Sequence, residues 1–157
     1  MRFSGTEMVI HQEVAAEVVS VHEAISHLSA LYPDFDRWYW GKVVPESAQG
    51  TRRIDTVTRD GRVVAVAISK KTDTERKLCT LWVKEEIKGG GHGVRLIRRA
   101  CEWLGTDIPH ATVPEEHIHE LGPVLERLGW VETGRTVSVY RPGMTEYIFN
   151  RENGSQA

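Results

Sequence analysis

A glycine-rich run, Lys88-Gly89-Gly90-Gly91-His92-Gly93, lies between a predicted strand and a predicted helix and limits the folds open to this chain. Residues 77–83 before it have the composition of a strand, and residues 94–104 after it repeat apolar side chains at helical spacing. The first N–H groups of a helix have no partner within the helix, and the helix dipole favours negative charge there. Glycine lets such a turn take positive φ and approach a phosphate without a Cβ. The run therefore predicts a site for a phosphate-bearing ligand.

Two common nucleotide-binding signatures do not fit this run. A P-loop requires Lys followed by Ser or Thr after its glycines, and no such pair follows here. In a Rossmann fingerprint, Gly89 and Gly91 would supply the first two glycines, but Val94 would stand in the third position. Valine is too large for close packing of helix against strand, so the ligand is expected to belong to another class.

The composition predicts one globular domain over residues 1–150 with a disordered tail at 151–157. The 157 residues are 40% hydrophobic and 27% charged, which suits a single core. A net charge of −2 provides no global basic field, so nucleic acid is possible but not favoured as a partner. No long apolar run or signal-peptide pattern is present, so we expect a cytoplasmic protein without a membrane partner. Cys79 and Cys101 fit no metal spacing, and no metal is expected.

The hydrophobic patterns predict elements in the order β-α-α-β-β-β-α-β-α-β-β. They are a strand at 6–11, helices at 12–31 and 34–43, strands at 52–59, 62–70 and 77–84, a helix at 91–104, a strand at 110–113, a helical stretch at 114–128, and strands at 131–140 and 145–150. Asp60-Gly61 is a hairpin signal, Asp34 is a candidate N-cap, and Gly122-Pro123 predicts a break in the last helical stretch.

Two short segments resemble motifs of the GNAT superfamily of N-acetyltransferases. The glycine run resembles the acyl-CoA motif Q/R-x-x-G-x-G/A, with Gly91 and Gly93 in the glycine positions and Lys88 where Gln or Arg is usual. The segment 125–130, Leu-Glu-Arg-Leu-Gly-Trp, resembles the ending Y-x-x-x-G-F of the family's last helix. The order of elements is also the GNAT order. The resemblance implies an α/β (α+β) GNAT fold, with a central mixed twisted sheet of six to seven strands flanked by about four helices.

The resemblance also implies an N-acetyltransferase that moves an acetyl group from acetyl-CoA to an amine by direct attack in a ternary complex. The strand at 110–113 would splay from its neighbour and admit the pantetheine arm. The residues implied in cofactor binding are Leu81, Trp82 and Val83 for the pantetheine arm, and Lys88, Gly89, Gly90, Gly91, His92, Gly93 and Val94 for the pyrophosphate. The final strands are common pairing surfaces in this family, so a homodimer is possible.

The catalytic acid and base remain open in the sequence. Leu125 stands where the family often has a Tyr that protonates the CoA thiolate. Tyr140, His117, His119 or ordered water are candidate replacements for that acid. Glu85 is a candidate base, with Glu75 and Glu86 as alternatives beside the same strand.

An aromatic segment predicts the acceptor side of the site. The implied acceptor-binding residues are Trp38, Tyr39, Trp40 and Lys42. Arg95, Arg98 and Arg99 share one side of the helix at 91–104, either as a solvated face or as a basic patch. Two other functions stay open: a GNAT-fold enzyme that modifies a nucleic acid, nucleobase or aminoacyl-tRNA, and a non-catalytic CoA-binding module.

Overall fold

The computed structural model describes residues 17–137 and 141–151. The strand predicted at 6–11 and the candidate acid Tyr140 lie outside these ranges. From the first helix onward, the described elements follow the predicted order along the chain.

The helical segments are an α-helix over 17–25, η1 (Ser26–Ala30), α2 (Phe35–Trp38), η2 (Tyr39–Val43), α3 (Val44–Gln49), η3 (Glu85–Ile87), α4 (His92–Leu104) and α5 (Glu115–Arg127). The helix predicted to end at 43 instead continues through a π-helical turn, η2, into α3. Pro45 lies at the start of α3, where a missing N–H is tolerated, so it does not end the helical segment. Asp34 occupies the N-cap position of α2, but its side chain makes no capping hydrogen bond.

The strands form two antiparallel sheets of three strands each. Sheet A contains β1 (Arg52–Arg59), β2 (Arg62–Lys71) and β3 (Arg76–Val83) in that order, and sheet B has the order β4 (Ala111–Pro114), β6 (Thr145–Phe149), β5 (Glu132–Val137). Asp60 and Gly61 both have positive φ at the β1–β2 turn, as the hairpin signal predicts. The described residues thus contain six strands in two sheets, which corrects the expected single sheet of six to seven strands.

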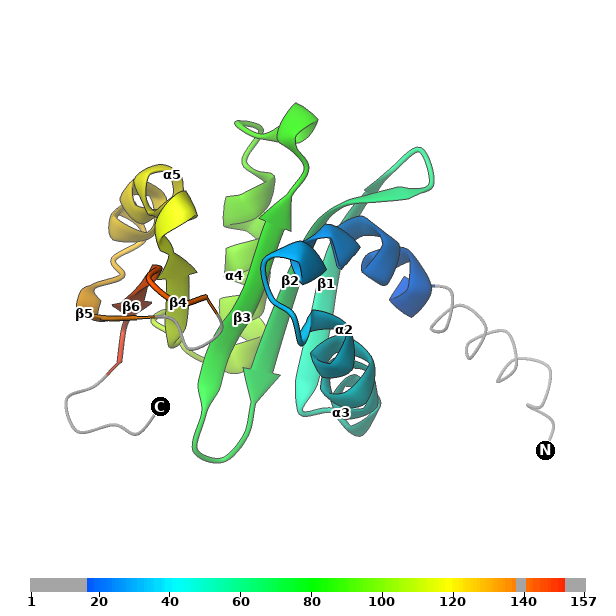
Figure 1. The fold of residues 1–157 in the computed structure, drawn as a ribbon, viewed down its shortest axis with the longest axis horizontal. Helices are drawn as coiled ribbons and strands as arrows, with labels where there is room; N and C mark the ends of the chain where they lie inside the picture. Colours follow the sequence, from blue (N-terminus) through cyan, green and yellow to red (C-terminus); the bar gives the residue numbers. More distant parts are fainter. Residues whose placement is uncertain (1–16, 138–140, 152–157) are drawn as a thin grey trace, which may run out of the picture.

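The two sheets meet at one point between β3 and β4. Lys77 and His110 form a parallel bridge, the Leu78 N–H donates to the His110 carbonyl at 3.0 Å, and the His110 N–H donates to the Arg76 carbonyl at 2.9 Å. Beyond this point the two strands diverge (Figure 1). The predicted splay after 110 is therefore present, and the interrupted pairing is the reason that one sheet becomes two.

Helix α5 runs through Gly122-Pro123 without a break, so the predicted interruption is wrong. Pro123 removes one hydrogen bond within the helix and would crowd a preceding residue that carries a Cβ. Gly122 has no Cβ, and it is buried against Ile118, where an added Cβ would meet the Ile118 Cδ1 at 3.4 Å. Packing of the apolar face, which includes Leu125, keeps both halves of α5 in one register.

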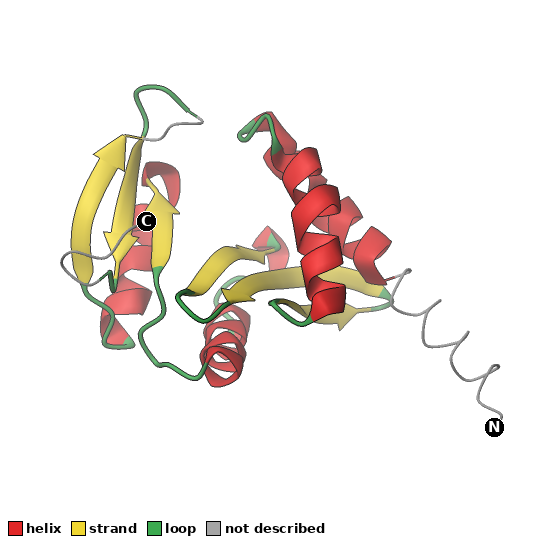
Figure 2. Cartoon of the chain, turned by 90° about the horizontal axis from the view of Figure 1, so that it is seen from below, coloured by secondary structure: helices red, strands yellow, loops and turns green. Residues whose placement is uncertain are grey.

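Helices cover both faces of sheet A, and Figure 2 shows this layering. On one face, the helix over 17–25 and α2 pack with Val66 and Ile68 of β2. On the other, the apolar stripe of α4 packs with Ala65 and Ala67 of the same strand, and this core continues to sheet B and α5. The second core therefore crosses the divergence of β3 and β4 and holds the two sheets in place.

Candidate active site

The glycine run forms the N-terminus of α4 in the conformation that the sequence predicts. Gly89 and Gly91 have φ of 88° and 80°, in the left-handed region, and Gly91 is the N-cap of α4. The first helical hydrogen bond runs from the Arg95 N–H to the Gly91 carbonyl at 3.1 Å. The N–H groups of His92, Gly93 and Val94 precede this bond and are free to bind an anion.

Side chains of the same chain fix the shape of this loop. Arg95 donates to the Gly90 carbonyl at 3.3 Å and contacts Nδ1 of His92 at 2.9 Å. Lys88 forms ion pairs with Glu85 at 2.9 Å and with Glu120 of α5 at 3.2 Å. The hydrogen bond that Lys88 donates to Glu85 raises the pKa of Lys88. Lys88 and Glu85 are thus paired with each other beside the loop. The donors available to an anion are backbone N–H groups.

A β-bulge in β3 turns backbone groups toward the gap between β3 and β4. The register with β2 shifts at Cys79, which has no partner of its own. Before the bulge, Arg76 and Leu78 bond to β4, as described above. After it, the Lys84 N–H donates to the Val64 carbonyl of β2 at 2.8 Å. Because successive residues of a strand point their backbone groups to opposite sides, the N–H and C=O groups of Leu81 and Val83 face away from β2, toward the gap.

Trp82 is oriented differently from Leu81 and Val83. It is the partner of Val66, so its backbone pairs with β2 rather than facing the gap. Its ring packs on the face of sheet A that the helix over 17–25 and α2 cover, 5.6 Å from the His27 ring. Of the three strand residues implied in pantetheine binding, two present their backbone to the gap.

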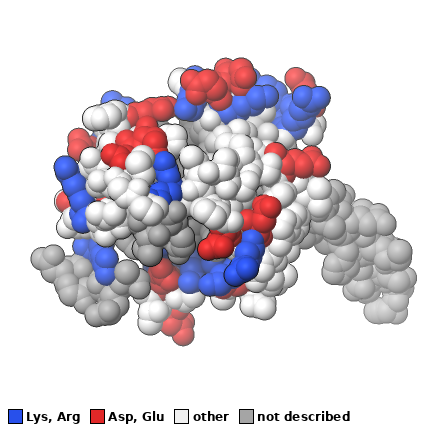
Figure 3. Space-filling model, viewed as in Figure 1, with Lys and Arg blue, Asp and Glu red and all other residues white. Residues whose placement is uncertain are grey.

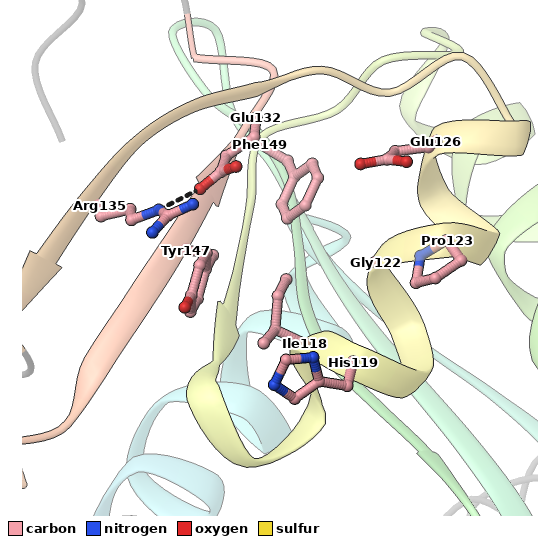
Figure 4. A pocket seen from close by; sticks show the side chains of 9 residues that line it. All are labelled: Ile118, His119, Gly122, Pro123, Glu126, Glu132, Arg135, Tyr147 and Phe149. Atoms are coloured by element: carbon pink, nitrogen blue, oxygen red, sulfur yellow. Dashed lines mark hydrogen bonds and ion pairs between the residues drawn. The ribbon is translucent and has the colours of Figure 1, made fainter.

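The position that the family often gives to a catalytic Tyr is part of the core. Leu125 is 1% exposed and packs in the core that α4, α5 and both sheets share. His117 is exposed on α5. His119 lines a hollow of about 270 Å³ between α5 and sheet B, together with Glu126, Tyr147 and other residues (Figure 4). No residue that lines this hollow comes from β3 or the glycine run, so the geometry does not bring His119 to the gap.

The aromatic segment splits between core and surface. Tyr39 is fully buried and its hydroxyl donates to the Val18 carbonyl at 2.6 Å, so its ring is not available as an acceptor platform. Trp38 is half-buried, with the Arg52 guanidinium 5.6 Å from its ring. Trp40 is 41% exposed, and Lys42 is exposed. Figure 1 places α2 and α3 beside the opposite end of sheet A from the top of β3, so these residues do not converge with the glycine run.

A cluster of four polar side chains, Tyr32, Glu116, Arg141 and Glu146, is a feature that the sequence analysis missed. The Arg141 guanidinium carbon lies 5.9 Å from the centre of the Tyr32 ring, and Arg141 donates to a Glu116 oxygen at 2.7 Å. Burial raises the pKa of Tyr32, and the charge of Glu146 adds to this effect. The four residues come from three distant segments, and no spacing in the sequence connects them.

The charged surface is mixed rather than basic. Arg98 and Arg99 are exposed on α4. On the face shown in Figure 3, basic and acidic side chains are interspersed, so this face carries no extended field of one sign. Among the residues described, no His, Cys, Asp and Glu side chains gather in a group of three that could hold a metal ion. None of the described helices combines the length and the apolar composition needed to cross a membrane.

Comparison with known proteins finds similarity in structure and not in sequence. No family model and no curated protein sequence matches the chain. A ribosomal-protein-alanine N-acetyltransferase from Brucella melitensis has a TM-score of 0.62 and 15% identity, over 88% of this chain and 93% of that chain. A Desulfovibrio desulfuricans protein described as an acetyltransferase of the GNAT family has a TM-score of 0.57 and 18% identity, over 69% of this chain and 75% of that chain. A Bacillus anthracis protein described as a streptothricin acetyltransferase, solved with acetyl coenzyme A, has a TM-score of 0.55 and 16% identity, over 64% and 62%. These similarities show a shared fold.

Proposed function

We propose that this chain, which has the fold of the GNAT acetyltransferases, transfers an acetyl group from acetyl-CoA to an amine. The observation that carries the proposal is the continuity of two features. The gap between β3 and β4 has outward-facing backbone at Leu81 and Val83, and it leads to the N–H groups at the start of α4. This arrangement suits a ligand with an amide-bearing arm and a pyrophosphate.

The proposed roles follow from this geometry. The backbone of Leu81 and Val83 binds the pantetheine arm, and the N–H groups of His92, Gly93 and Val94 bind the pyrophosphate. The amine then attacks the thioester carbonyl directly, with rate enhancement from positioning and from backbone donors near the oxyanion. Because Leu125 cannot donate a proton, the CoA thiolate receives its proton from another group or from water.

A thermal-shift titration with acetyl-CoA, CoA and dephospho-CoA tests cofactor binding. The informative variant is Gly93→Asp. Its new Cβ would lie 3.6 Å from the Val83 Cγ2, an ordinary contact, and an acidic residue in the first helical turn favours the folded state. The new carboxylate would repel a pyrophosphate. At about 100 times its dissociation constant, acetyl-CoA should stabilise the wild type by about 2.7 kcal/mol and should stabilise Gly93→Asp far less.

The matched control is Gly93→Asn, which has nearly the same shape without the charge. It should retain more of the acetyl-CoA stabilisation than Gly93→Asp. A folded wild type that shows no shift at millimolar acetyl-CoA would contradict the proposal, as would an Asp variant with an unchanged shift. Release of the CoA thiol with a panel of amines then separates a transferase from a module that binds CoA without turnover.

A further inference from the structure

The side chain of Glu146 points to the face of sheet B that α5 leaves uncovered. Its neighbour Tyr147 points to the other face of sheet B, and together with Phe149 it lines the hollow beneath α5. Because side chains alternate along a strand, Glu146 points to the opposite face, which we call the front. Its cross-strand partner is Pro114, the last residue of β4. Glu146 therefore lies one strand spacing, about 5 Å, from the edge where β4 diverges from β3.

Side chains from both sides of the gap converge on this place. Tyr32 follows η1 on the side of sheet A, and the charge of Glu146 acts on its hydroxyl. Arg141 precedes β6 and connects Tyr32 to Glu116 of α5, by the contacts given above. Glu146 thus lies near Tyr32, Arg141 and Glu116, and we call this group of side chains, beside the edge where β4 diverges from β3, the mouth.

Glu146 differs from the two other carboxylates at this mouth. Glu116 is paired with Arg141, and Glu115 accepts a hydrogen bond from the Thr145 N–H at 3.1 Å. The Glu146 side chain is half-buried, and within the described part of the chain its carboxylate forms neither an ion pair nor a hydrogen bond. A half-buried carboxylate without a cationic partner is suited to receive a positively charged group from solution.

We propose that Glu146 receives the acceptor amine at the front of the gap and acts as its general base. This assignment rests on the proposed acetyl transfer. The acceptor is a primary alkylammonium ion, which passes one proton to the Glu146 carboxylate. The neutral nitrogen attacks the thioester carbonyl, the C–N bond forms and the C–S bond breaks. The second amine proton ends on the CoA thiolate, and the Glu146 proton returns to solvent.

Steady-state kinetics of Glu146→Gln and Glu146→Asp test the assignment. The acceptors are spermidine and a lysine-containing peptide, the readout is release of the CoA thiol, and calorimetry measures acetyl-CoA affinity. Glu146→Gln should lower kcat by about 100-fold or more, the range for a lost general base, and Glu146→Asp should recover part of it. The acetyl-CoA Kd should stay within about twofold.

Glu126→Gln is the matched control, because Glu126 lines the hollow behind sheet B and should have no effect on transfer. If Glu146→Gln transfers acetyl groups as well as Glu126→Gln, Glu146 is not the base, although acetyl transfer itself stands. If Glu146→Gln loses acetyl-CoA binding, Glu146 shapes the cofactor site and the assignment is wrong. A wild type that binds no acetyl-CoA would overturn the proposed function together with this assignment.

Discussion

At the scale of single residues, His110 shows how a side chain at the junction of the sheets couples stability to pH. Burial lowers the pKa of His110 below its ordinary value of 6.5, and the charges of Lys77 and Arg151 lower it further. Its Nε2 is buried and, among the described residues, has no hydrogen-bond partner. The folded state therefore binds the His110 proton less readily than the unfolded chain does.

The stability that neutral His110 provides should be complete above about pH 6.5 and should decline as the pH falls toward the lowered value. In that window the unfolded chain carries more protons, so the free energy of unfolding rises with pH. His110→Gln should lose less stability between pH 7.5 and pH 5.5 than the wild type, as measured by urea unfolding at both values. Identical losses in the two proteins would show that His110 is not the group responsible.

At the scale of elements, a buried ion pair connects α3 to β1. Arg52 is 5% exposed, and its Nε and Nη2 donate to one Glu46 oxygen at 2.8 and 2.6 Å. Removal of the Glu46 carboxylate would leave a buried guanidinium with Trp38 and Cys79 as its remaining neighbours. The energetic effect of such a loss comes mainly from the charge that stays behind.

Glu46→Ala should lower the free energy of unfolding by about 2 kcal/mol, measured by urea denaturation. The comparison variant is Glu132→Ala. Glu132 pairs with Arg135 at 2.7 Å, but the Arg135 side chain is 61% exposed, so loss of this ion pair should change stability much less than Glu46→Ala does. Equal effects of the two substitutions would show that burial of Arg52 does not decide the energy of its ion pair.

Prediction from sequence succeeded where short-range signals determine an element. Asp60-Gly61 set the hairpin, and the glycines before α4 set both the turn and the start of the helix. It failed where distant packing decides. Pro123 is a strong local signal for a break, but the burial of Gly122 and Leu125 outweighs it. Tyr32 and Arg141 are more than a hundred residues apart, so only the folded chain shows that they meet.

At the scale of the whole molecule, Asn150 connects the end of β6 to two other segments. Its side chain donates to the Pro109 carbonyl at 2.9 Å and accepts from the Val131 N–H at 3.0 Å. Its φ of 62° lies in the left-handed region, which Asn tolerates better than most residues. One side chain thus joins the entry to β4, the entry to β5 and the end of the sheet.

Asn150→Gly should keep the backbone conformation and lose only the two hydrogen bonds, which lowers stability by about 2 kcal/mol. Asn150→Ala should lower it further, because a Cβ without a local hydrogen bond disfavours positive φ. Thermal and urea unfolding of both variants measure the difference. If the Gly variant is as stable as the wild type, the side-chain hydrogen bonds of Asn150 do not hold sheet B in place.

Because the glycine loop is held in shape by its own side chains and glycines, it bears on how the substrate range of such a protein could evolve. Its shape comes from Gly89, Gly91, Arg95 and Lys88, and a pyrophosphate handle is common to every CoA thioester. The loop would therefore recognise the donor class without discriminating among acceptors. Discrimination would belong to the mouth around Tyr32 and Arg141, on separate segments of chain. Substitutions there would change which amine the protein accepts and leave its binding of the CoA thioester unchanged.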